Sequence, residues 1–144
     1  MTPLPHRYEV HLTGAPTGYA DLSADGRPVV RAAPPKEFGG PGDAWSPEHL
    51  LLAAVETCFL FTLRAVARAM KVDFVALDVD AVGTVDRPDG VTRFTAITLV
   101  AAITIARGSD RDQVMRLLEK TERACLVSAS LSTPVRVEPT IIEA

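Results

Sequence analysis

The feature that most constrains the fold is a long apolar segment that runs from Pro47 to about Met70 without an internal glycine or a second proline. Ser46 is a favourable N-cap residue, and Pro47 suits the first helical position, where its missing N–H costs nothing. We therefore predict a helix of about 24 residues. Apolar residues occupy nearly every side of it, which is typical of a helix that is buried all round: Leu50, Leu51, Leu52, Val55, Phe59, Leu60, Phe61, Leu63 and Val66.

The size of the chain limits how such a helix can be covered. With 144 residues, the chain is near the commonest size of one domain, so we expect a single domain over residues 1–144. A long helix that is buried on all sides needs more cover than one small domain easily supplies. We therefore expect a homodimer.

Shorter elements are predicted before the long helix. Tyr8, Val10 and Leu12 alternate with polar residues, and turn signals follow them, which predicts a short antiparallel meander. The stretch from Ala32 to Trp45 is rich in glycine and proline. Such a composition predicts a loop without regular structure.

A hairpin and a second helix are predicted after the long helix. The turn sequence from Asp86 to Gly90 is followed by a long apolar run from Val91 to Ile105, which predicts a β-hairpin. We expect the second helix to start at Ser109, with Asp112 as the partner in a weak capping box. Spacings of three and four residues define its predicted core side: Val114, Leu117, Leu118, Thr121 and, at or just beyond the helix end, Cys125.

The last predicted strand completes an α+β layout. It runs from Val135 to Ile141 and contains Pro139, which favours a position at the edge of a sheet. The order of meander, long helix, hairpin, helix and strand lacks the regular alternation of a doubly wound parallel sheet. The sequence therefore excludes a Rossmann fold, and it excludes a thioredoxin-like fold because it also has no Cys-x-x-Cys motif.

Charge and hydropathy limit the partners and the location. The net charge is -3 and the pI is near 5.6, so the sequence has no electrostatic footprint for nucleic acid or an anionic membrane, and we expect neither as a partner. The first seven residues have no apolar signal segment, and the longest apolar run, near Leu50 to Val55, is too short to span a bilayer. We therefore expect a cytoplasmic protein.

Cys58 and Cys125 are the candidates for chemistry, and they are the only cysteines. Two cysteines are too few for a disulfide-rich secreted scaffold or a thiolate metal site. The three histidines form no metal constellation either, so we expect no metal and no cofactor. In a reducing compartment, such a pair is either inert core or redox machinery.

Four short motifs follow one another along the chain: a Gly-rich loop, a Pro-Glu at the start of the long helix, a Cys-Phe ten residues after that Glu, and a late Cys followed by Val-Ser. They are Gly39-Gly40-Pro41-Gly42, Ser46-Pro47-Glu48, Cys58-Phe59 and Ala124-Cys125-Leu126-Val127-Ser128. With these motifs in this order, the sequence resembles the OsmC/Ohr family of organic hydroperoxide reductases over roughly residues 8 to 140.

The resemblance implies an α+β, OsmC-like fold, in which antiparallel sheets wrap around a long buried central helix in an intertwined homodimer. It also implies a thiol peroxidase of the oxidative stress response. Its Cys58 thiolate attacks an organic hydroperoxide, or hydrogen peroxide, and becomes a sulfenic acid. Cys125 condenses with that acid to a disulfide, which a small or protein-bound dithiol reductant reopens.

Glu48 occupies the position of a glutamate that, in relatives, works with an arginine to stabilise the thiolate. A simpler role is to complement the positive end of the helix dipole. Ten residues of helix rise about 15 Å, so Glu48 and Cys58 of one straight helix cannot touch. If both serve one site, Glu48 reaches Cys58 of the other subunit, which predicts antiparallel central helices.

The arginine of the family is missing from its usual place. Organic hydroperoxide resistance proteins carry it in the first hairpin turn, which reads Gly14-Ala15-Pro16-Thr17-Gly18 in this chain. Arg31 is the first candidate to replace it as the thiolate-stabilising cation. Arg27, Lys36, Arg64 and Arg68 are weaker candidates, and an ordinary solvated role also fits each of these side chains.

Two further positions carry expectations about the site. Phe38 and Trp45 flank the Gly-rich loop and are candidates for the apolar wall of a substrate pocket, although Trp45 equally fits a hydrophobic staple. Glu56 lies two residues before Cys58 on a helix that we expect to be buried, so it needs a partner. Arg31 and Arg64 are the candidates for that partner.

Two other functions stay open beside the peroxidase. One is a non-catalytic OsmC-like dimer that binds a small apolar ligand or senses redox state. The other is a structural dimer in which both cysteines are inert. The presence of Cys58, Cys125 and Glu48 favours the enzyme, whereas the missing turn arginine favours the binding or sensing protein.

Overall fold

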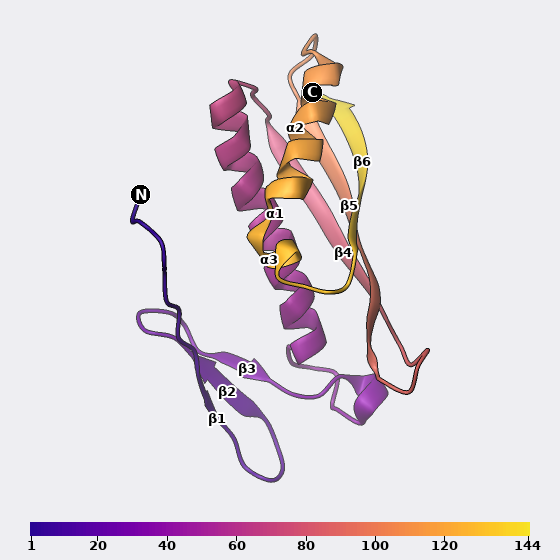
Figure 1. Cartoon of the computed structure of the whole chain (residues 1–144). Helices are drawn as coiled ribbons and strands as arrows, with labels where there is room; N and C mark the ends of the chain where they lie inside the picture. Colours follow the sequence, from indigo (N-terminus) through magenta and orange to yellow (C-terminus); the bar gives the residue numbers. More distant parts are fainter. The chain divides into compact units, whose positions relative to one another are not determined.

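The computed structural model describes all 144 residues, which form two compact units, Met1–Leu51 and Leu52–Ala144 (Figure 1). The fold is α+β, as predicted. Each unit has a three-stranded sheet of its own, with strands in the order β1-β2-β3 in the first unit and β4-β5-β6 in the second.

The first unit contains the predicted meander. Strands β1 (His11–Thr13), β2 (Ala20–Ser23) and β3 (Val30–Ala32) pair antiparallel in sequence order. Gly18 and Gly26 lie in the two connections with positive φ angles of 92° and 71°, a conformation that glycine adopts without the penalty of a side chain. The strands are shorter than predicted, since the alternation that begins at Tyr8 forms a strand only from His11.

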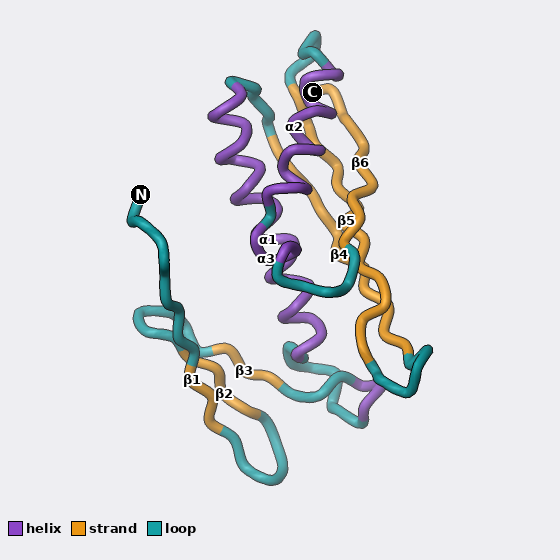
Figure 2. The backbone as a smooth tube through the Cα atoms, viewed as in Figure 1, coloured by secondary structure: helices purple, strands orange, loops and turns teal.

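The Gly- and Pro-rich stretch is a loop, as predicted, but it is not free of regular structure (Figure 2). A short 3-10 helix, η1 (Lys36–Phe38), interrupts it and ends at Gly39 in the left-handed conformation. The N–H of Gly40 donates to the carbonyl of Pro35 at 2.9 Å and tightens this turn. The loop is therefore held by its own backbone hydrogen bonds.

The long helix α1 (Pro47–Met70) has both of the predicted ends. The N–H of His49 donates to Ser46 Oγ at 3.1 Å, which is the hydrogen bond expected of an N-cap serine. Lys71 follows the helix with a φ of 57°, a left-handed conformation that stops further helical growth.

The chain by itself does not bury α1 on all sides, in agreement with the expectation that one small domain cannot supply all of its cover. One stripe at intervals of four residues is buried: Val55, Phe59, Leu63 and Ala67. On the opposite side, Phe61 is 57% exposed. The apolar residues of the other sides therefore have no complete cover within one copy.

The length and composition of α1 would also allow it to cross a membrane. The apolar run near Leu50 alone is too short to span a bilayer, whereas the whole helix of 24 residues is long and apolar enough. Core helices of water-soluble proteins meet the same criterion, so the result is weak evidence for a membrane span.

The second unit is built on a mixed sheet. Strands β4 (Ala76–Asp86) and β5 (Arg93–Ile105) form the predicted antiparallel hairpin. Strand β6 (Val135–Glu143) lies at the sheet edge, as the proline within it predicts, and pairs with β5 in parallel. A parallel pair needs a long crossover connection, which helices α2 and α3 provide here.

Helix α2 (Arg111–Ala124) starts two residues later than predicted. Its N-cap is Asp110, whose carboxylate accepts hydrogen bonds from the N–H groups of Asp112 and Gln113 at 3.0 and 3.2 Å. The predicted cap residue, Ser109, donates its hydroxyl to the carbonyl of Ala106 instead. The short helix α3 (Leu126–Ala129) follows α2 directly.

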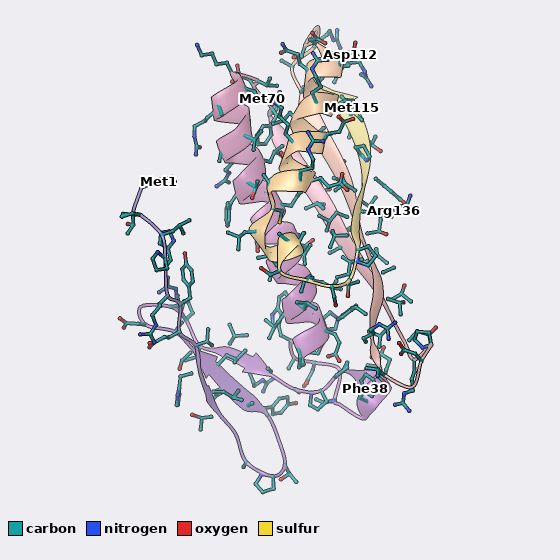
Figure 3. The ribbon with its side chains drawn as sticks, in the orientation of Figure 1. Met1, Phe38, Met70, Asp112, Met115 and Arg136 are labelled. Atoms are coloured by element: carbon teal, nitrogen blue, oxygen red, sulfur yellow. The ribbon has the colours of Figure 1, made fainter.

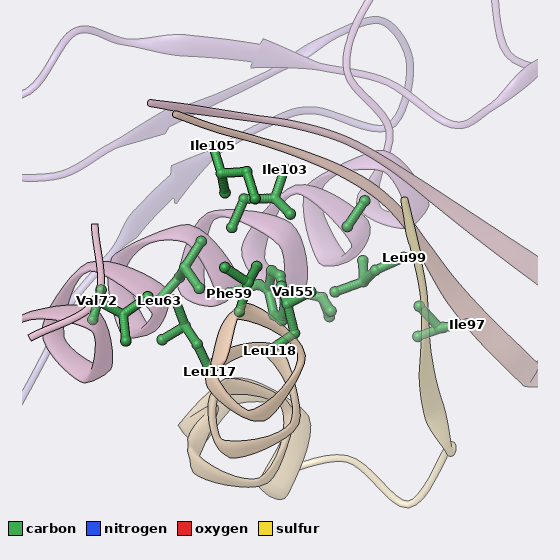
Figure 4. Packing of buried hydrophobic residues seen from close by; sticks show 13 residues of the cluster. Val55, Phe59, Leu63, Val72, Ile97, Leu99, Ile103, Ile105, Leu117 and Leu118 are labelled. Carbon is green, nitrogen blue, oxygen red and sulfur yellow. The ribbon is translucent and has the colours of Figure 1, made fainter. Parts of the chain in front are cut away.

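The core of the second unit lies between the sheet and the two long helices, which cover the same face of it (Figures 1 and 4). Alternate residues of β5 face the helices, and α2 contributes the face that its spacing predicts. The buried members of this cluster are Val55, Phe59, Leu63, Ala67, Val72, Ile97, Leu99, Ala101, Ile103, Ile105, Val114, Leu117 and Leu118.

Candidate functional site

Cys58 lies on α1 beside the buried stripe and is itself only half-buried. Its neighbours in the sequence, Val55 and Phe59, pack into the core and fix this part of the helix. The hydroxyl of Thr62, one turn further along, lies 3.8 Å from Cys58 Sγ. The thiol is therefore held on a rigid element while it keeps some access to solvent.

Cys125 lies at the junction of the two C-terminal helices. It is the C-cap residue of α2 and the N-cap residue of α3, and it is 2% exposed. The hydroxyl of Ser128 donates to Cys125 Sγ at 3.5 Å. The core-facing position that the spacing of α2 predicts for this cysteine is confirmed.

The fold brings the two cysteines together, although the chain between them contains the whole β4–β5 hairpin and α2. Both are free thiols, and they lie near enough for each to shift the pKa of the other. Each side chain belongs to the second unit, so this unit alone forms the pair.

The surroundings of Cys58 favour its thiolate. Burial is the largest single effect and raises the pKa of Cys58. Hydrogen bonds from the Val127 N–H and the Cys125 thiol outweigh it, together with smaller contributions from the Thr62 hydroxyl and the Leu126 N–H, so that the pKa lies below its ordinary value. All of these donors favour the charged form of the sulfur.

The surroundings of Cys125 have the opposite effect. Burial raises the pKa of Cys125, and the neighbouring Cys58 raises it further. The hydroxyl and N–H of Ser128 only partly offset this. Of the two, Cys58 is therefore the thiol that ionises first, which is the property expected of an attacking nucleophile.

Glu48 lies in the first turn of α1, in the first unit. Its Oε1 atom is buried and has no hydrogen-bond partner in the chain. A buried carboxylate oxygen without a partner is costly. Glu48 Oε1 is thus a buried acceptor for which the chain supplies no donor.

Arg31 on β3 is held by two residues of the first unit. Its guanidinium lies 4.0 Å from the ring centre of Tyr19 and 4.0 Å from Asp43 Oδ2. The Tyr19 hydroxyl donates to both carboxylate oxygens of Asp43, at 2.9 and 3.0 Å, and this hydrogen bond is the main cause of a raised pKa of Tyr19. Arg31 is thus part of a small ordered cluster on the surface.

Phe38 and Trp45 lie on either side of the Gly-rich loop, and both are largely exposed, at 59% and 51%. Phe38 ends η1 (Figure 3), and the ring of Trp45 meets that of His49 edge to face at 6.5 Å. An open hollow beside the same loop is lined by other residues, among them Tyr19, Pro34 and Gly40.

Glu56 has a different neighbour from those expected. Arg64 of the same unit forms no ion pair with Glu56 and lies over the ring of Phe61 instead. Burial and the nearby Asp80 carboxylate raise the pKa of Glu56, which the N–H of Ala81 partly offsets. The prediction of Arg64 as the partner is therefore wrong, and Arg31 as the partner stays a prediction.

A comparison with protein families identifies the chain. A family model described as OsmC-like protein matches residues 40–140. The chain belongs to the OsmC-like family. It is also 26% identical over 116 residues to YmaD of Bacillus subtilis, an uncharacterized protein, with 78% of this chain and 77% of that relative covered.

Solved structures of OsmC-like proteins have the same fold. An OsmC-like protein of unknown function from Vibrio cholerae superimposes with a TM-score of 0.83 at 15% identity, covering 94% of this chain and 100% of that one. The organic hydroperoxide resistance protein OhrB of Bacillus subtilis gives a TM-score of 0.69 at 20% identity, covering 94% and 98%. These structures confirm the predicted fold.

Sequence reasoning missed several side chains of this OsmC-like site. Thr62 and Ser128 contact the two sulfurs, and the spacing of four residues between Cys58 and Thr62 on one helix was an available signal. In the first unit, the hydrogen bond between Tyr19 and Asp43 beside Arg31 was missed as well, because it joins residues 24 positions apart and no local pattern reveals it.

Proposed function

We propose that this protein is a thiol-dependent peroxidase that reduces organic hydroperoxides. The Cys58 thiolate attacks the peroxide, so that an S–O bond forms, the O–O bond breaks, and the leaving alkoxide takes a proton to become an alcohol. Cys125 then attacks the sulfenic sulfur, an S–S bond forms, and water leaves. A dithiol reduces this disulfide and is itself oxidised to a disulfide.

One observation carries the proposal: two free thiols lie near each other, and their surroundings move their pKa values in opposite directions. A nucleophile benefits from a lowered pKa because the thiolate is the reactive form. The resolving thiol, Cys125, needs only to be close to the Cys58 sulfur. The names of two structural relatives, the organic hydroperoxide resistance proteins of Bacillus subtilis and Elizabethkingia anophelis, support the same chemistry.

In this proposal the working unit is a cytoplasmic homodimer. The apolar sides of α1 that one copy leaves without complete cover support a second copy. Glu48 then acts at Cys58 of the other subunit, where a donor for its buried oxygen would be found. Arg31 supplies the cation, and Phe38 and Trp45 form the apolar wall against the organic part of the peroxide.

The proposal is tested by counting free thiols before and after one equivalent of cumene hydroperoxide. We expect the loss of two thiols per chain, their recovery with a dithiol, and a disulfide between Cys58 and Cys125 in a peptide map. With Cys58→Ser no thiol should be lost, and with Cys125→Ser only one, as a sulfenic acid.

Unchanged thiols after hours with the peroxide would refute the enzyme. Loss of both thiols without turnover in the presence of a small or protein-bound dithiol would favour the redox sensor instead.

A further inference from the structure

The side chain of Thr62 has an unusual partner for a threonine in a helix. Such hydroxyls commonly donate to the carbonyl four residues earlier. Thr57 does so to Ala53 at 2.7 Å, and Thr121 does so to Leu117 at 2.8 Å. The hydroxyl of Thr62 instead faces Cys58 Sγ at 3.8 Å.

The position of Thr62 fixes this contact. Residues four apart lie one above the other on the same face of a helix, so the hydroxyl comes to the sulfur without any rearrangement. Thr62 is half-buried, and the branched side chain has few rotamers in a helix. In the rotamer that the structure shows, the hydroxyl already lies beside the sulfur.

We propose that Thr62 is a further catalytic residue, whose hydroxyl donates a hydrogen bond to the Cys58 thiolate. The inference rests on the proposed peroxidase. In related proteins an arginine stabilises the thiolate, whereas here a neutral hydroxyl donates a hydrogen bond to it. Thr62 keeps its proton throughout. Its hydroxyl stabilises the negative charge on the Cys58 sulfur until an electron pair of that sulfur forms the S–O bond.

The contact discriminates between the two forms of Cys58. In the neutral pair either atom can be the donor, so the thiol has no special need of the hydroxyl. A thiolate can only accept, and the hydroxyl then donates to it. The contact thus stabilises the charged form selectively, in line with the lowering effect of Thr62 on the pKa of Cys58.

The other groups around Cys58 are known, so the effect of Thr62 can be separated from theirs. From the α2–α3 junction, the Cys125 thiol and the N–H groups of Leu126 and Val127 act on the sulfur. The nearest charged residue along α1 is Glu56. The groups that act on its pKa are the Asp80 carboxylate and the Ala81 N–H of β4. Replacing Thr62 leaves all of these groups in place.

The test measures the rate at which iodoacetamide alkylates Cys58, followed by mass spectrometry over a range of pH. Thr62→Val keeps the shape of the side chain but removes the hydroxyl. We expect the midpoint of its rate profile to rise by about half to one pH unit, and the rate near neutral pH to fall about threefold to tenfold. Peroxide turnover should fall by a similar factor.

Three control variants accompany it. Thr57→Val removes a hydroxyl from the same helix, one that bonds to a carbonyl, and should keep the original profile. Thr62→Ser restores a hydroxyl and should restore the midpoint. Thr62→Ala guards against strain from the second methyl group of valine and should behave as Thr62→Val does.

An unchanged midpoint in both Thr62→Val and Thr62→Ala would overturn the inference. Alkylation needs no peroxide, so the result is independent of the thiol count with cumene hydroperoxide. A raised midpoint in a protein that never reacts with peroxide would support the hydrogen bond to Cys58 and refute the peroxidase and the catalytic role.

Discussion

The two units of the chain differ in how much core they have. Residues 52–144 bury a continuous apolar cluster between a sheet and two helices. In residues 1–51, only Ala32, Ala33 and Ser46 are buried. Large apolar side chains remain exposed there instead: Tyr8, Val10, Leu12, Val29, Phe38 and Trp45.

The two thiols and the residues proposed to assist them lie in different units. The second unit, which has its own core, also contains the thiol pair and the groups that lower the pKa of Cys58. The first unit contains Arg31 and Glu48, whose roles remain proposals. Exposed apolar surface of this kind marks interaction sites. In the proposed homodimer, a second copy would cover some of these side chains.

Matched substitutions on strands of the two units should give the largest contrast. Leu99→Ala on β5 removes a side chain that is 1% exposed and should lower the free energy of unfolding by about 2–5 kcal/mol. Leu12→Ala on β1, where leucine is 60% exposed, should cost under about 0.5 kcal/mol in dilute protein. Urea titration of both variants measures this.

Equal costs for the two variants in dilute protein would contradict the comparison. A cost for Leu12→Ala that grows with protein concentration would instead identify Leu12 as a residue that a second copy covers.

Hydrogen exchange should give the next largest contrast. The amides of β5 lie in the centre of a sheet over the core, whereas those of β1–β3 lie in a small sheet without one. In dilute protein, we expect the β1–β3 amides to open at a free energy at least about 2 kcal/mol below that of β5. Mass spectrometry of peptic fragments at two protein concentrations measures this difference, and association should reduce it.

The smallest effect is expected at Glu56. Its raised pKa means that the folded state favours the protonated form, so the stability from this group is present at low pH and is lost as the pH rises through its folded pKa. Glu56→Gln mimics the protonated form. It should raise the melting temperature slightly at pH 7 and leave it unchanged near pH 3.

Glu122→Gln on the exposed surface of α2 is the control for that variant and should change little at either pH. A lower melting temperature for Glu56→Gln at pH 7 would mean that the carboxylate has a stabilising partner after all.

Local signals predicted most of the fold. The Ser46-Pro47 pair marks the start of α1, and the turn from Asp86 to Gly90 joins β4 to β5. The parallel pairing of β6 was not predictable in this way, because it depends on where the crossover helices return the chain. The start of α2 was misplaced because Ser109 and Asp110 are both good caps, and only the geometry of the turn selects Asp110.

The candidate site was predictable only in part. Cys58 and Cys125 stand out because they are the only two cysteines, and the spacing of α2 places Cys125 towards the core. The groups that act on Cys58 from Leu126 and Val127 are backbone N–H groups, which no side-chain pattern encodes. The neighbours of Glu56 were missed because pairing with β4 depends on the tertiary fold.

The position of the cysteines at the two ends of a long intervening segment has a consequence for the chain entropy. A disulfide between Cys58 and Cys125 would close a loop of the chain that contains β4, β5 and α2. In the chain-entropy view, closing a loop of several tens of residues destabilises the unfolded ensemble by about 4 kcal/mol. Oxidation of the two thiols would then raise the free energy of unfolding, and the melting temperature would depend on the redox state of the thiols.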